Sequence, residues 1–169
     1  MRMQRMKTAN FSLLTLLLAN NIGCRSTPLE SLTQQLNRDA RVSSFFSEFN
    51  AEQRQVEFAR LDIERQYLTY LCGNQKIHPP TLYLAESFAK VGAQGVPFLM
   101  AKLYLTKSDM TIRDIIYVFA WMQRLKTYNV VTDKLLIGLL WKKTSEIHDD
   151  FWRGQVYKEI EGILSMPPE

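Results

Sequence analysis

The stretch TIRDIIYVFAWMQRLK, residues 111–126, decides the fold class. Its apolar residues return every three or four positions, the spacing that places side chains on one face of an α-helix. This face comprises Ile112, Ile115, Ile116, Phe119, Met122 and Leu125. We predict an amphipathic helix here, beginning at Asp109 or Thr111, with its apolar face in a core.

The same spacing recurs on both sides of this stretch, and we find no convincing strand alternation. Before it, helices are predicted to begin at Thr27-Pro28, Asn50, Leu82 and Gly95-Val96-Pro97; after it, at Thr132 and at Asp149 or Asp150. Core positions assigned to two of these helices include Phe98, Leu99, Leu103 and Tyr104, then Leu135, Leu136, Leu139 and Leu140. We therefore predict an all-α domain of about six to seven helices.

The longest predicted helix, from Ala51 to Cys72, is expected to end before Gly73. Asn50 and Gln53 form a capping pair at its start. Two apolar stripes run along it, one of which includes Leu61 and Cys72. Two stripes predict packing on two sides, with Cys72 as a buried small hydrophobe.

Residues 84–99, LAESFAKVGAQGVPFL, resemble a HEAT-like repeat: a helix, a glycine at its end, then Val-Pro opening a second helix. A weaker copy about 35 residues later lacks this punctuation. The resemblance implies a short helical stack. An irregular helical bundle is the alternative, and both belong to the all-α class.

Charge and composition exclude several classes of protein. The chain has 169 residues, which suggests one domain, and two cysteines, too few for a disulfide scaffold. Its net charge of +4 is concentrated at the start, where Arg2, Arg5 and Lys7 stand without any acid in residues 1–23. The remainder carries 18 basic and 17 acidic residues, so we expect no nucleic-acid partner.

The basic start is followed by the short apolar run FSLLTLLL, residues 11–18, and then by small residues near position 23. This layout is typical of a secretory signal, and the run is shorter than the roughly 20 residues of a membrane span. Asn21-Ile22-Gly23-Cys24 resembles a bacterial lipoprotein lipobox. The resemblance implies cleavage of residues 1–23 and acylation of Cys24, which leaves a single helical domain over residues 24–169.

Since Arg25 follows the cysteine, the resemblance also implies sorting to the outer membrane, facing the periplasm, if the host is Gram-negative. The alternative is a soluble periplasmic or secreted protein in which Cys24 is an ordinary cysteine. A disulfide between Cys24 and Cys72 then becomes possible.

Catalytic and cofactor motifs are not found in the sequence. No nucleophile elbow, phosphate loop, dinucleotide fingerprint or zinc helix motif occurs. His148-Asp149-Asp150 could hold a metal, but helix capping by the acids is the favoured interpretation. We predict no metal site, no cofactor and no enzymatic activity; the alternative is a secreted enzyme acting on the cell wall.

Opposite the apolar face of residues 111–126 lie Arg113, Tyr117, Trp121 and Arg124. Tyr, Trp and Arg are the residue types that dominate interface hot spots. We predict that they form an accessible binding face for a protein in the cell envelope; the alternative is a second packing layer within the domain. The chain is then an envelope interaction module, such as a scaffold or an immunity-type protein.

Overall fold

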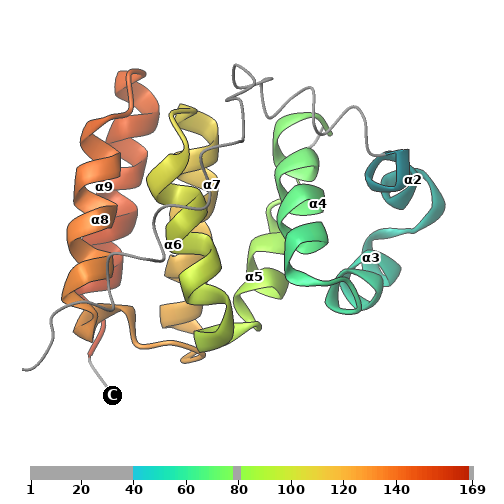
Figure 1. Ribbon diagram of the computed structural model, residues 1–169, viewed down its shortest axis with the longest axis horizontal. Coiled ribbons are helices and arrows are strands. Elements are labelled where there is room, and N and C mark those ends of the chain that lie inside the picture. Colours follow the sequence, from blue (N-terminus) through green and yellow to red (C-terminus); the bar gives the residue numbers. More distant parts are fainter. Residues whose placement is uncertain (1–39, 78–80, 168–169) are drawn as a thin grey trace, which may run out of the picture. The chain divides into compact units, whose positions relative to one another are not determined.

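A computed structural model describes residues 40–77 and 81–167 (Figure 1). The predicted signal, Cys24, the helix start at Thr27-Pro28 and His78 lie outside the described residues. Within the described ranges the chain forms α-helices and short 3-10 helices and no strand, which confirms the all-α prediction. The α-helices are α2 (Ala40–Glu48), α3 (Ala51–Ala59), α4 (Ile63–Gln75), α5 (Tyr83–Ala89), α6 (Val96–Leu105), α7 (Asp109–Arg124), α8 (Lys134–Ser145) and α9 (Asp150–Leu164).

Helix α7 is the centre of the packing. It contacts α4, α5, α6, α8 and α9. Five of its predicted core residues are completely buried: Ile112, Ile115, Ile116, Phe119 and Met122. Neighbouring helices add further buried side chains, among them Tyr70, Phe88, Leu99, Leu136, Val156 and Ile160. The apolar repeat of residues 111–126 is therefore confirmed as the core of the fold.

The predicted continuous helix from Ala51 to Cys72 is wrong, because it is divided into α3 and α4. The Asp62 carboxylate accepts a hydrogen bond from the Arg65 backbone N–H at 2.9 Å and so begins a second helix. Leu61 lies half-buried in the break, and the expected apolar stripe does not continue through it. At the start of α3, the capping pair of Asn50 and Gln53 is confirmed in both directions, at 3.0 Å.

Helix α4 also continues past Gly73, where the sequence predicted its end. A Cβ atom at this position would lie 1.9 Å from Thr81 Oγ1 and 2.9 Å from Phe46 Cζ. Gly73 therefore allows α2 and the residues before α5 to approach α4 closely. Cys72, the residue before Gly73, is buried as predicted, while its possible partner Cys24 lies outside the described residues.

The connection between α5 and α6 lies where the glycines and the proline of the sequence predicted it. Gly92 has a φ of +63°, a conformation that favours glycine, and a short 3-10 helix (Gly92–Gly95) connects the two helices. Helix α6 begins at Val96 with Pro97 in its first turn. Two core assignments nearby are wrong: Tyr104 is 63% exposed and Leu135 is 81% exposed.

Candidate functional site

The predicted binding face of α7 is covered in part by α9. Arg113 is only 5% exposed, and its guanidinium lies 4.4 Å from the centre of the Trp152 ring. The prediction that Arg113 flanks an accessible face is therefore wrong. The reason is non-local: α9 supplies both the cover and a cation–π partner, and neither is visible in the sequence of α7.

Arg113 belongs to a buried polar cluster centred on Asp114, which is 0% exposed. Arg113 Nε and Nη2 donate to Asp114 Oδ1 at 2.9 and 2.5 Å, and Gln75 Nε2 donates to Oδ2 at 3.0 Å. The Tyr70 hydroxyl donates to the Asp114 carbonyl at 2.9 Å. Burial raises the pKa of Asp114, while Arg113 and the hydrogen bond from Gln75 oppose that rise. The cluster joins α4 to α7 in the interior.

The other three predicted residues lie along the boundary between α7 and α9. Tyr117 and Trp121 are half-buried, and Arg124 is exposed. Arg124 forms an ion pair with Glu159 of α9 and lies 5.3 Å from the centre of the Trp121 ring. Burial raises the pKa of Tyr117, and the negative charge of Glu159 adds to the effect. These residues make internal contacts and also remain open to solvent.

Sequence reasoning missed the contribution of α9 to this surface. Phe151 is 62% exposed, and its ring packs edge-on against Trp152 with 4.9 Å between centres. The available signal was the adjacent pair Phe151-Trp152 in the first turn of a helix, because neighbouring side chains point roughly 100° apart and a helix that packs on one side leaves one of two bulky neighbours closer to solvent. We use the name α7–α9 seam for Tyr117, Trp121, Arg124, Phe151, Trp152 and Glu159.

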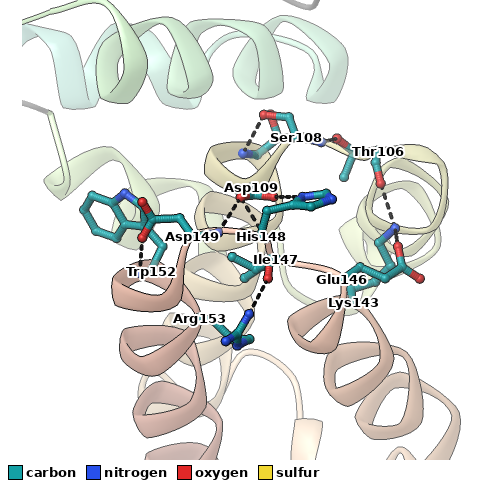
Figure 2. A network of polar contacts seen from close by, with 11 residues as sticks. Thr106, Ser108, Asp109, Lys143, Glu146, Ile147, His148, Asp149, Trp152 and Arg153 are labelled. Atoms are coloured by element: carbon teal, nitrogen blue, oxygen red, sulfur yellow. Dashed lines mark hydrogen bonds and ion pairs between the residues drawn. The ribbon is translucent and has the colours of Figure 1, made fainter.

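The start of the seam is fixed by a network around Asp109 (Figure 2). Asp109 Oδ2 accepts hydrogen bonds from the backbone N–H groups of His148 and Asp149 at 2.9 and 3.0 Å, and Oδ1 lies 3.2 Å from His148 Nδ1. Desolvation acts to raise the pKa of Asp109, but these hydrogen bonds outweigh it and lower the pKa. Asp109 therefore ties the first turn of α7 to the connection between α8 and α9.

Asp149 accepts a hydrogen bond from the Trp152 backbone N–H at 3.0 Å, which confirms the predicted capping of α9. His148 remains exposed beside it. A shallow depression of about 510 Å³ next to this connection is lined by Lys107, Ser145, Glu146, Ile147, His148 and Arg153. Most of its charged groups are engaged internally: Arg153 pairs with Asp150 and donates to the Ile147 carbonyl, and Glu146 pairs with Lys143. Lys107 is exposed.

A second surface of different character lies on α6 and α8. The exposed positions of α6 are Pro97, Ala101, Tyr104 and Leu105, none of which is charged. The neighbouring α8 exposes Lys134, Leu135, Gly138 and Lys142. The two helices meet where Lys142 Nζ lies 5.6 Å from the centre of the Tyr104 ring and Lys143 Nζ donates to the Thr106 carbonyl at 2.7 Å. We call these exposed residues the α6–α8 face.

Among the described residues, no group of three or more His, Cys, Asp or Glu side chains is placed to hold a metal ion. No helix in that part of the chain is long and apolar enough to cross a membrane. No family model, curated protein or solved structure matches this chain.

Proposed function

We propose that this chain is a cell-envelope protein, anchored by lipid on Cys24, whose helical domain binds another protein through the α7–α9 seam. One observation carries the proposal: four aromatic side chains and an arginine gather along one helix boundary and remain partly open to solvent. Aromatic residues and arginine are enriched at protein interfaces. The Arg124–Glu159 pair and the Asp109 network hold this boundary in place before any partner arrives.

The envelope location rests on the signal-like start and the lipobox resemblance of residues 21–24. In a Gram-negative host it implies an outer-membrane protein facing the periplasm. A scaffold role and an immunity-type role both fit a partner-binding seam.

Position-specific photo-crosslinking in the native envelope tests the seam. A photoreactive amino acid at Phe151 should give one discrete adduct, because the side chain is 62% exposed and its replacement removes no core contact. The matched control is Val56 on α3, which is 55% exposed and lies outside the seam. The adduct is identified by mass spectrometry, and binding is then measured with both purified proteins.

Trp121→Ala should weaken that purified complex by about 2 kcal/mol or more if the indole is a hot spot. Equal crosslinking from Phe151 and Val56, or unchanged affinity of the Trp121 variant, contradicts the seam as the interface. Release of sugar or peptide products from purified peptidoglycan would instead favour the alternative of a cell-wall enzyme.

The anchor is tested separately. Intact-mass analysis of the membrane fraction should find a mature chain that begins at Cys24 and carries acyl groups, since two or three chains anchor a protein stably. Cys24→Ser should release the protein or leave residues 1–23 attached. An unmodified soluble protein with another N-terminus would contradict the anchor and leave the seam untouched.

A further inference from the structure

The described residues, 40–77 and 81–167, leave the α6–α8 face incompletely covered. Helix α6 has the sequence VPFLMAKLYL, in which Lys102 is the one charged residue. Lys102 is turned toward α4, 3.8 Å from Glu64, and lies over the rings of Tyr67 and Phe98. A helix that is apolar on all sides is normally buried on all sides. Here Tyr104 and Leu105 are 63% and 69% exposed, so this side of α6 has no cover among the residues that the structure describes.

Helix α8 extends this face. Leu135, Gly138 and Lys142 are exposed and spaced by three and four residues, which places them along one side of the helix over two turns. Leu135 is 81% exposed, and a Cβ atom at Gly138 would meet nothing within 4 Å. Since Lys142 touches Tyr104, this side of α8 and the open side of α6 are continuous.

The charges on these helices have one sign. Residues 91–108 and 134–145 contain no Asp, Glu or Arg, and their charged residues are Lys102, Lys107, Lys134, Lys142 and Lys143. Lys102 and Lys143 are paired with Glu64 and Glu146, whereas Lys107, Lys134 and Lys142 are exposed. An exposed apolar surface edged by lysines is complementary to an anionic surface with an apolar layer beneath it.

We propose that the α6–α8 face docks on an anionic lipid bilayer surface, with Tyr104, Leu105 and Leu135 inserted at the interface and Lys134 and Lys142 among the headgroups. Residue type separates this face from the seam. Lysine is depleted and arginine enriched at protein interfaces, whereas lysines beside Tyr, Trp and Leu are typical of helices lying at a membrane surface. The α6–α8 face has lysine alone, while the α7–α9 seam has Arg124 with four aromatics.

The inference rests on the proposed function, because an acyl anchor at Cys24 keeps the domain beside a bilayer. Two attachments also suit each other energetically, since binding through a single weak contact is marginal and a tether raises the effective concentration of the second contact. Docking would hold the domain against the bilayer through α6 and α8 and leave a different pair of helices, α7 and α9, for the protein partner.

The test places an environment-sensitive fluorophore on the full-length protein at Leu135→Cys, with Val56→Cys as the matched control. Both carry Cys72→Ala, although Cys72 is buried. The proteins are reconstituted with vesicles of equal parts phosphatidylethanolamine and phosphatidylglycerol, or of phosphatidylcholine alone. We expect a blue shift, and quenching by a lipid-borne quencher, at position 135 in the anionic vesicles only. The fluorophore at position 56 should report an aqueous environment with both kinds of vesicle.

Charge is tested with Lys142→Gln and with Lys90→Gln, an exposed lysine at the end of α5. Lys142→Gln should lower the ratio of docked to undocked protein roughly five-fold, the contribution expected of one lysine near an anionic surface, and Lys90→Gln should leave it unchanged. Equal signals at positions 135 and 56, equal docking on phosphatidylcholine, or equal effects of the two lysine variants would overturn the proposal.

The same experiment distinguishes lipid docking from two other ways of covering the α6–α8 face. If position 135 is already shielded in buffer without vesicles, then residues 1–39 or a second copy of the chain cover the face, and lipid docking is wrong. Mass analysis of the same samples reports acylation of Cys24, and crosslinking from Phe151 reports the seam. Failure of the proposed function is therefore distinguishable from failure of docking.

Discussion

Removal of the Asp114 carboxylate tests the buried polar cluster between α4 and α7 most directly. Asp114→Ala deletes the acceptor of three hydrogen bonds and leaves Arg113, 5% exposed, without its ion-pair partner. Breaking a buried ion pair from one side costs about 3–5 kcal/mol, because the remaining charge is uncompensated. The Trp152 ring over Arg113 offsets a part of this, so we expect about 3 kcal/mol.

Thermal and urea unfolding followed by circular dichroism measure this change. For a chain of this size each kcal/mol shifts Tm by roughly 2–4 °C, so Asp114→Ala should lower Tm by roughly 6–12 °C. The matched control is Glu57→Ala, which breaks the exposed pair with Arg60 on α3, and it should change stability by less than about 1 kcal/mol. Similar losses in the two variants would refute the buried placement of Asp114.

The double variant Arg113→Met, Asp114→Leu separates two causes of the loss. If an orphaned charge dominates, replacing both partners by apolar side chains should restore much of the stability lost in Asp114→Ala. If the double variant is as unstable as the single one, the hydrogen bonds from Gln75 and the packing around Trp152 carry the energy instead.

Three further predictions concern the ends and faces of the helices. Hydrogen bonds lower the pKa of Asp109 in the folded protein. The stability that this carboxylate contributes is therefore present above its unfolded pKa of about 4 and is lost as pH falls through the lower folded value. Asp109→Asn should reduce this loss of stability at acid pH, as measured by unfolding at a series of pH values. Gly73→Ala should destabilise the protein by about 1–3 kcal/mol, because the new Cβ atom would collide with Thr81. Gly162→Ala in α9 should stabilise it by up to about 1 kcal/mol, because nothing lies within 4 Å of the new Cβ atom. Equal effects of the two variants in urea titrations would contradict the packing described for these two glycines. Trp121→Ala should lower the free energy of unfolding by about 1–2 kcal/mol, because the indole ring is half-buried. Truncation of a fully buried aromatic side chain costs roughly 3–5 kcal/mol. A loss of Tm that corresponds to the larger figure would place Trp121 in the core.

The helices themselves could be predicted because local signals agree. In α7 the apolar repeat, the acid in the first turn and the Arg at the end all indicate the same helix. The break between α3 and α4 could not be predicted, because apolar residues recur at helical spacing in the sequence on both sides of Asp62. This repeat hid the signal of Asp62 itself, which is a good capping residue. Gly73 shows the converse: a glycine expected just after a helix end lies inside the last turn of α4, where it allows close packing.

The site was harder to predict because its geometry depends on pairs of helices. An arginine on a helix face is normally exposed. Arg113 is buried because its partners stand beside it in sequence, at Asp114, and 39 positions away, at Trp152. Only Trp152 brings α9 over this face of α7, and no pattern in the sequence of α7 reveals that contact. Tyr117, Trp121 and Arg124 were chosen by residue type, and the structure adds Glu159 of α9 as the ion-pair partner of Arg124.

Tyr104 and Leu135 are apolar residues at helical spacing that the structure leaves exposed. Both were assigned to a core because apolar residues at helical spacing need a cover, and that requirement is a property of the sequence alone. The structure shows that the domain supplies no cover for them among the described residues. The requirement itself does not disappear, since exposed apolar surface costs free energy in water wherever it lies. A wrong core assignment on an otherwise correct helix is therefore itself a clue to an external contact. The lysines beside these residues, rather than arginines, are what direct that contact toward lipid.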